Sequence, residues 1–227
     1  MQYWDDPMPR HTPHKTSDKS QAPGKPAPNA KRAWQRMLSG RRLDLLDPTP
    51  LDIEIEDIAH GLSRLARWNG QTKGAWAWSV AQHALLVEAL FAHANPGVAA
   101  RWRQAALLHD AAEYVIGDMI TPFKTALGVS FMDIEEDIIQ KVHIRFGLPA
   151  KLPAKINQEI STADRTAAYL EAVHLAGFSE TEARLIIAKP APAFKAFPSQ
   201  LVPHPPNRAK ADFLAKFEQF NAARQKR

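Results

Sequence analysis

Apolar residues recur at helical spacing along most of the chain, with short polar or proline-containing breaks between the periodic segments. Such spacing, at every third or fourth residue, is typical of helices that bury one face. It predicts helices at about 54–68, 80–94, 98–115, 132–146, 154–176 and 209–221. Gly61 is the one weak point of the first, and Ser79 is the expected N-cap of the second. Strand-like alternation occurs at 51–55, where it runs straight into the first helix. The sequence therefore predicts an all-α protein, a bundle of about six or more helices with their apolar faces inward.

The N-terminal segment, residues 1–31, differs in composition from the rest of the chain. It is rich in proline, lysine, serine, threonine and glutamine, which is typical of disordered segments. We expect a disordered basic tail there, followed by one domain at 32–227. Residues 1–42 hold nine Lys or Arg and three Asp, so the net charge of +5 resides at this end. The basic character of the chain is therefore a poor reason to expect nucleic-acid binding by the domain.

Two further features of the sequence limit the possible metal ligands and the expected cellular compartment. The chain has no cysteine, which excludes disulfides and thiol chemistry and leaves histidine and carboxylates as the strong metal ligands. Polar or charged residues interrupt the longest apolar stretches, and the N-terminus lacks the basic-then-apolar pattern of a signal peptide. We therefore expect a cytoplasmic protein that does not enter a membrane.

The segment 105–118 places four polar residues inside an otherwise apolar, helix-favouring run. On a helix, His109 and Glu113 share a face, and Asp110 is turned about 100° away but can still bind the same atom. Burying an imidazole and a carboxylate without partners is costly, and a divalent cation suits both ligand types. Taken alone, the His-Asp pair also fits a solvated turn at the end of a helix.

Two other predicted helices each contribute one residue of ligand type on or beside an apolar stripe, His83 and Asp164. By itself, His83 fits a core histidine with a hydrogen-bond partner, and Asp164 fits a solvated or helix-capping residue. Considered together with His109 and Asp110, however, the two residues favour a shared metal site.

The order of these residues resembles that of the HD-domain superfamily of metal-dependent phosphohydrolases, and most closely its branch of bacterial 5′-deoxynucleotidases. The resemblance covers about residues 51–176 and rests on five blocks in the same order as in the family. They are IAHGL at 58–62 with RW at 67–68, SVAQH at 79–83, LLHDAAE at 107–113, GDMITPFK at 117–124 and ADR at 163–165. The basic tail and Trp78, where the family more often has tyrosine, are departures.

The resemblance implies an HD-domain-like helical bundle that binds one divalent cation through His83, His109, Asp110 and Asp164. A mixed set of nitrogen and oxygen ligands suits Mn²⁺, Co²⁺, Fe²⁺ or Zn²⁺ better than Mg²⁺. The cation would lower the pKa of a water molecule, which would then attack phosphorus.

The resemblance also implies two catalytic carboxylates, Glu113 and Asp118, and three substrate-binding residues, Arg67, Trp68 and Lys124. Glu113 would orient or deprotonate the water or protonate the leaving oxygen, and the basic residues would neutralise phosphate charge. Taken alone, Asp118 also fits an ordinary loop, the two basic residues fit surface salt bridges, and Trp68 fits packing at a helix end.

The function implied by the resemblance is removal of the 5′-phosphate from nucleoside monophosphates, with deoxy forms preferred. A triphosphohydrolase of the same fold, which releases triphosphate from a deoxynucleoside triphosphate, is the alternative. A nucleic-acid-binding module that acts through the basic tail is a third reading, from a different class. The expected partner is a nucleotide, without a membrane or nucleic acid, and the sequence leaves a homodimer or a larger homo-oligomer open.

Overall fold

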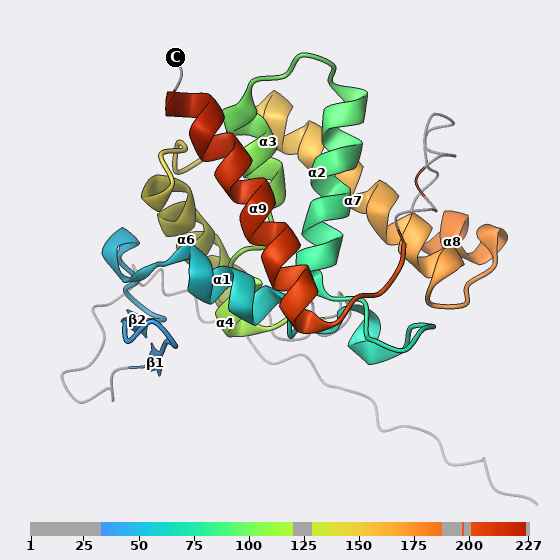
Figure 1. Cartoon of the computed structure of the whole chain (residues 1–227), viewed down its shortest axis with the longest axis horizontal. Helices are drawn as coiled ribbons and strands as arrows, with labels where there is room; N and C mark the ends of the chain where they lie inside the picture. The colour runs from blue at the N-terminus through green and yellow to red at the C-terminus, as the bar shows by residue number, and fades with distance from the viewer. Residues whose placement is uncertain (1–32, 120–128, 188–196, 198–200, 226–227) are drawn as a thin grey trace, which may run out of the picture. The chain divides into compact units, whose positions relative to one another are not determined.

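The protein is mostly α-helical, as the sequence predicts (Figure 1). The computed structural model describes residues 33–119, 129–187, 197 and 201–225, all within one compact unit that spans Arg32–Arg227. Within this described part, strand is confined to one short hairpin, and no helix is long and apolar enough to cross a membrane. The predictions for the tail at 1–31 and for Lys124 concern residues that lie outside the described ranges.

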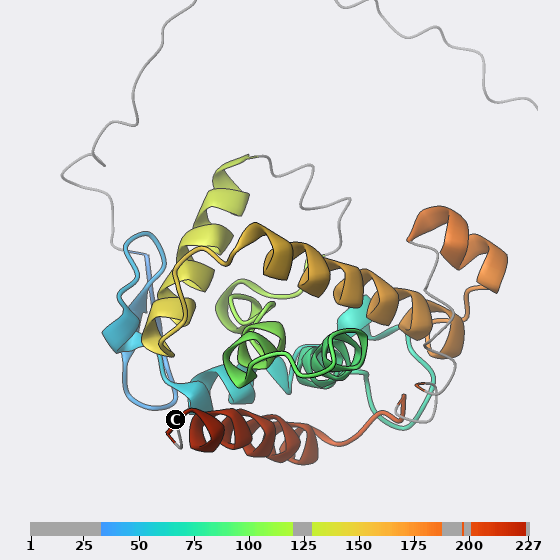
Figure 2. The same ribbon diagram turned by 90° about the horizontal axis from the view of Figure 1, so that it is seen from above.

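Helix α2 (Val80–Ala94) lies at the centre of the bundle. It contacts α3 (Ala100–Leu107), α7 (Ala154–His174) and α9 (Pro206–Gln225). Figure 2 shows α2 nearly end-on, with α7 on one side and α9 on the other. Most of its residues are buried, so α2 is covered on nearly all sides rather than along a single stripe. This burial holds the first turn of α2, which carries His83, inside the protein.

The start of α2 confirms the prediction that Ser79 caps this helix. The Ser79 backbone is extended, and its side-chain oxygen accepts a hydrogen bond from the backbone N–H of Gln82 at 3.3 Å. The bond satisfies one of the amide groups that a helix leaves without a partner in its first turn. The position of His83 relative to the start of the helix is therefore fixed by local sequence.

The helix predicted at 54–68 is shorter than expected. Helix α1 (Ile55–Leu62) ends early, and the chain then enters a short 3₁₀ segment, η2 (Arg67–Gly70). Within η2, Trp68 and Asn69 adopt left-handed backbone conformations, with φ of 57° and 50°. The apolar spacing continues past the helix end because side chains of the non-helical segment still pack against the core. The spacing alone therefore overestimates the length of α1.

The helix predicted at 98–115 is interrupted. Helix α3 ends at Leu107, and α4 (Glu113–Ile116) begins after a turn at 108–112. Two amides around the turn donate to carbonyl groups three residues back rather than four, at 2.9 and 3.0 Å. The expectation that His109 and Glu113 share one face of a continuous helix is therefore wrong, because a turn interrupts the helix between them.

Three further predicted helices are confirmed. Helix α6 (Val129–Arg145) corresponds to the helix predicted at 132–146 and packs against the 3₁₀ segment η1 (Pro50–Asp52). Helix α7 corresponds to 154–176, and α9 extends beyond 209–221 at both ends. The alternating residues 51–55 form no strand: Leu51 and Asp52 belong to η1, and Ile55 begins α1.

Two short elements were not predicted. The first is an antiparallel hairpin of β1 (Trp34–Arg36) and β2 (Arg42–Asp44), and the second is α8 (Glu180–Ile186). Strands of three residues are too short to show a period in the sequence. The hairpin turn is tied to α1 by Asp57, whose carboxylate accepts hydrogen bonds from the Ser39 amide at 3.0 Å and the Ser39 hydroxyl at 2.5 Å.

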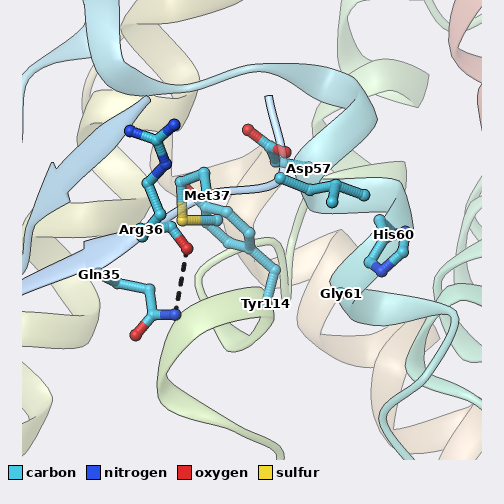
Figure 3. A pocket seen from close by; sticks show the side chains of 8 residues that line it. Gln35, Arg36, Met37, Asp57, His60, Gly61 and Tyr114 are labelled. Carbon is cyan, nitrogen blue, oxygen red and sulfur yellow. Dashed lines mark hydrogen bonds between the residues drawn. The ribbon is translucent and has the colours of Figure 1, made fainter. Parts of the chain in front are cut away.

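Gly61 of α1 lies directly against Tyr114 of α4. A Cβ atom on Gly61 would lie 2.8 Å from the Cβ of Tyr114 and 2.9 Å from its carbonyl oxygen. Figure 3 shows both residues beside a pocket between the hairpin and α1, which His60 also lines. Glycine at this position therefore lets α1 approach the short helix that carries Glu113.

Replacing Gly61 with alanine should destabilise the protein. Alanine favours a helix over glycine by about 1 kcal/mol. The added methyl group would however meet backbone as well as side-chain atoms of Tyr114, and overpacking typically costs about 1–3 kcal/mol. We expect a lower thermal midpoint by calorimetry. Gln219→Ala, on the exposed face of α9, is the control, with a change within about 0.5 kcal/mol. A midpoint at or above that of the wild type for Gly61→Ala would contradict the close approach.

Candidate metal centre

The structure brings the four predicted ligands together from three parts of the chain. His83 lies on α2, Asp164 on α7, and His109 and Asp110 lie in the turn after α3. One ligand atom from each residue lies within 4.8 Å of the others. Asp164 Oδ1 is 3.0 Å from His83 Nε2 and 3.8 Å from His109 Nε2. Asp110 Oδ2 is 3.5 and 3.1 Å from the same two nitrogens. We call these four residues the ligand cluster.

Both imidazole rings turn Nε2 toward the cluster and Nδ1 away from it. His83 Nδ1 lies 2.6 Å from Glu171 Oε1, and His109 Nδ1 lies 2.9 Å from the carbonyl oxygen of Ala106. Both partners are acceptors, so each Nδ1 carries a proton, and the neutral form of each ring presents its Nε2 lone pair to the cluster. Both Nε2 atoms are buried, and neither has a hydrogen bond of normal geometry. Such an arrangement fits nitrogen atoms that bind a cation.

The same two imidazoles have raised pKa values. Burial lowers the pKa of both rings, and Arg67 lowers that of His83 further, but neighbouring carboxylates outweigh these effects. The result is a pKa of about 9 for His83 and a pKa well above the usual value for His109. Metal ligation requires the neutral ring, so a cation and a proton compete for the same lone pairs.

The two aspartates of the cluster are held in the ionised form. Burial raises the pKa of each carboxyl group, but interactions with His83 and His109 outweigh it, and the pKa of Asp110 falls to about 2. The pKa of Asp164 is lowered for the same reason. When both imidazoles are neutral, as metal ligation requires, the two carboxylates give the cluster a negative charge that a divalent cation would balance. The Asp164 side chain is 37% exposed whereas His83 has no exposed surface, so solvent reaches the cluster from the side of Asp164.

Glu171 is a residue of the site that the sequence analysis missed. It lies on α7 two helical turns after Asp164, on the same face, and its side chain has no exposed surface. Its Oε1 accepts hydrogen bonds from His83 Nδ1 at 2.6 Å and from Trp78 Nε1 at 2.8 Å. A charged residue two turns after a candidate ligand, on the face of a helix expected to be buried, was the signal available in the sequence.

Arg67 is buried beside the cluster, and the exposed surface salt bridge considered from the sequence is therefore wrong for it. Its side chain is 15% exposed; Nη1 donates to Asp118 Oδ1 at 3.3 Å, and Nε lies 3.5 Å from Glu171 Oε2. Burial by itself lowers the pKa of Arg67, but these two carboxylates, together with Asp110 and Glu113, outweigh burial and raise the pKa above its usual value. The guanidinium group is therefore charged and electrostatically linked to the cluster.

Trp68 packs inside the protein with its polar atom bonded. Its Nε1 donates to Glu171 Oε2 at 3.0 Å, and its ring lies 5.7 Å from that of Phe178. The backbone before it is fixed because the Arg67 amide donates to the Trp78 carbonyl oxygen at 2.8 Å. A left-handed backbone is rare for a bulky residue and occurs where the surroundings impose it. The packing role considered for Trp68 is thus present, and its substrate-binding role stays a prediction.

The two predicted catalytic carboxylates differ in their surroundings. Glu113 begins α4, is buried and lies outside the ligand cluster. Asp118 follows α4 and accepts the hydrogen bond from Arg67, so it belongs to the site rather than to an isolated loop. Lys124 lies outside the described residues.

No protein-family model matches the chain. The chain is 62% identical over 187 residues to an uncharacterized protein of Rhodobacter capsulatus, an alignment that covers 82% of this chain and 94% of that protein. The chain belongs to the same family as this protein. That relative is uncharacterized, so the chemistry of this family is indicated by the ligand cluster and not by the relative.

The donor set of this family member fits a metal ion. Two imidazole nitrogens and two carboxylate oxygens form a mixed ligand shell of the kind that binds divalent transition metals. Each imidazole is oriented by an acceptor on its far side, as metal-binding histidines usually are. The cluster could therefore hold one cation without rearrangement of the ring orientations.

His109→Ala and Asp110→Ala should each lose bound divalent cation, because each removes one of the four ligands. The measurement is the metal content of purified protein after incubation with Co²⁺ and desalting, determined by mass spectrometry of the elements. His60→Ala is the matched control: this histidine lines the pocket of Figure 3 and is not part of the cluster, so the variant should keep the wild-type content. Wild-type metal content in both cluster variants would overturn the assignment.

Proposed function

We propose that the protein is a metal-dependent phosphohydrolase of the HD-domain type that removes the 5′-phosphate from nucleoside monophosphates, with deoxynucleotides preferred. The observation that carries the proposal is the convergence of His83, His109, Asp110 and Asp164, with both buried Nε2 atoms facing the two carboxylates. The order of these residues along the chain, on a mostly helical framework, is what the resemblance to the HD-domain superfamily leads one to expect.

The cluster would hold one divalent cation through His83 Nε2, His109 Nε2 and one carboxylate oxygen of each aspartate. Such a cation acts as a Lewis acid and lowers the pKa of a bound water toward neutrality. The mixed ligand set favours Mn²⁺, Co²⁺, Fe²⁺ or Zn²⁺ over Mg²⁺.

Arg67 is suited to bind the phosphate group of the substrate. Its guanidinium group is buried, charged and close enough to the cluster for Asp110 and Glu113 to affect its pKa. Asp118 accepts a hydrogen bond from Nη1, and Glu171 forms an ion pair with the guanidinium group, so one of its five N–H donors is used in a hydrogen bond. A charge that is already fixed in place loses little freedom when phosphate binds, and arginine matches phosphate geometry well.

Glu113 is the proposed general acid–base residue. It is a buried carboxylate that directly follows the turn carrying His109 and Asp110, and its charge acts on Arg67. From this position it would take a proton from the attacking water or give one to the leaving oxygen. Asp118, which accepts a hydrogen bond from Arg67, would hold the phosphate-binding group in position while Glu113 moves the proton.

The direct test is product analysis on a panel of nucleotides. Metal-loaded protein is incubated with dAMP, AMP, ADP and dATP in Mn²⁺, Co²⁺ or Mg²⁺, and the phosphate products are separated. We expect orthophosphate from dAMP, more from dAMP than from AMP, and no product with His109→Ala. Release of triphosphate from dATP would replace the proposal with the triphosphohydrolase alternative. Absence of hydrolysis with every metal and nucleotide would overturn both.

Glu113→Gln should separate proton transfer from metal binding. The amide keeps the volume of the buried side chain but is a poor acid or base, so turnover should fall by about 10² to 10⁴. Metal content should stay at the wild-type value because Glu113 is outside the cluster. Glu159→Gln, on α7 beside Lys155, is the control and should leave both quantities unchanged. Loss of metal from Glu113→Gln would make Glu113 a ligand, and wild-type turnover would make it structural.

A further inference from the structure

One buried carboxylate, that of Glu171, is surrounded by hydrogen-bond donors from two functional parts of the site. On one oxygen, Oε1, it accepts from His83 Nδ1 at 2.6 Å and from Trp78 Nε1 at 2.8 Å. On the other, Oε2, it accepts from Trp68 Nε1 at 3.0 Å and lies 3.5 Å from Arg67 Nε. His83 belongs to the ligand cluster, whereas Arg67 and Trp68 belong to the proposed substrate-binding residues. One oxygen therefore contacts a proposed metal ligand, and the other contacts two proposed substrate-binding residues.

We propose that Glu171 is a positioning residue that fixes the His83 ring for metal binding and, through its second oxygen, fixes Arg67 and Trp68 beside the same cluster. The part that concerns Arg67 rests on the proposed function, whereas the part that concerns His83 requires only that the cluster binds a cation. Glu171 does not itself belong to the ligand cluster.

The contact to His83 has a definite consequence for metal binding. The imidazole can rotate about its bond to Cβ, and the hydrogen bond from Nδ1 to Glu171 fixes both the rotation and the tautomer. His83 has no exposed surface, so bulk solvent does not provide the same contact. Outer partners of this kind typically change metal affinity or activity by about 10- to 100-fold when they are replaced.

The contacts on the second oxygen connect metal binding to substrate binding. Trp68 has a left-handed backbone, and the bond to Glu171 is one of the contacts that hold it there. Arg67 directly precedes it, so the same carboxylate restrains two consecutive residues of η2. Loss of one oxygen acceptor should therefore disturb the position of the guanidinium group relative to the cluster.

Glu171→Gln is the most informative variant because it keeps the shape of the side chain. The amide retains one accepting oxygen, but its NH₂ group cannot accept a hydrogen bond. Whichever way the amide is turned, either His83 and Trp78 lose their acceptor, or Trp68 loses its acceptor; in both cases Arg67 loses its ion pair with a charged carboxylate. Glu171→Asp, which keeps the charge but shortens the side chain by one methylene, provides a second variant should the first fail to fold.

Glu88→Gln is a matched control. Glu88 is also a buried carboxylate with cationic partners, since Arg103 Nε lies 2.6 Å from its Oε1 and Lys216 Nζ lies 3.7 Å from its Oε2. It lies on α2, the helix that carries His83, but it contacts none of the ligand cluster through these bonds. A loss of general stability should therefore appear in both variants, whereas a loss of positioning should appear only at Glu171.

The experiment measures Co²⁺ affinity by calorimetry on the full chain, together with thermal midpoints and the indole N–H signals of ¹⁵N-labelled protein. We expect Glu171→Gln to bind Co²⁺ about 10- to 100-fold more weakly than the wild type and to shift the signals of Trp68 and Trp78. Glu88→Gln should keep the wild-type Co²⁺ affinity even if its midpoint falls. Wild-type affinity in Glu171→Gln with an unshifted Trp68 signal, wild-type affinity in a folded Glu171→Asp variant, or an equal loss in Glu88→Gln would overturn the proposal.

The Co²⁺ titration contains no substrate, so it is independent of whether the protein hydrolyses nucleotides. A wild type that binds Co²⁺ through the cluster but hydrolyses nothing would contradict the proposed function and leave the test of His83 positioning intact. In an active enzyme at saturating Co²⁺, Glu171→Gln should also raise KM for dAMP. An unchanged KM would overturn the connection to Arg67.

Discussion

The orientation of two imidazole rings is the constraint on which the whole site depends. A buried acceptor holds the Nδ1–H of each ring, Glu171 for His83 and a backbone carbonyl for His109, so that both Nε2 atoms face Asp110 and Asp164. Two helices of the fold position the residues of this arrangement. Helix α2 is covered on nearly all sides, which places His83 in the interior, and α7 contributes both a ligand and the acceptor that orients His83. Buried lone pairs beside two carboxylates are costly alone and favourable around a cation.

The sequence was sufficient for most of the helices and insufficient for their interruptions. Long segments with helical spacing and a clear start, such as α2 behind Ser79, were predicted correctly because local interactions decide them. The predicted helices at 54–68 and 98–115 are interrupted although their apolar spacing continues. In the first, the Arg67 amide bonds to Trp78 far along the chain, and in the second, the amides of the turn bond to carbonyl groups three residues back. The hairpin and α8 are too short to show a period, although the capping box of Ser179 and Glu182 was a visible local signal for α8.

For the site, residue type and order identified the ligands, but not the contacts that orient them. His83, His109, Asp110 and Asp164 stood out because polar groups in apolar stripes require partners. Glu171 did not, since its importance comes from donors far away in the sequence. Gly61, which reads as a weak position in a helix, is instead required by the close approach of Tyr114. The proposed catalysis combines three groups of residues: ligands for a cation, a buried arginine for phosphate and a buried carboxylate for proton transfer.

We infer that the four residues of the cluster bind one divalent cation. Anomalous diffraction from crystals grown with Co²⁺ is the most direct test. Data collected on either side of the cobalt absorption edge locate the ion without reference to activity. We expect one strong peak within about 2.0–2.2 Å of His83 Nε2, His109 Nε2 and an oxygen of each aspartate, distances typical of transition-metal ligands. Cobalt peaks elsewhere on the chain, with none between these four side chains, would contradict it.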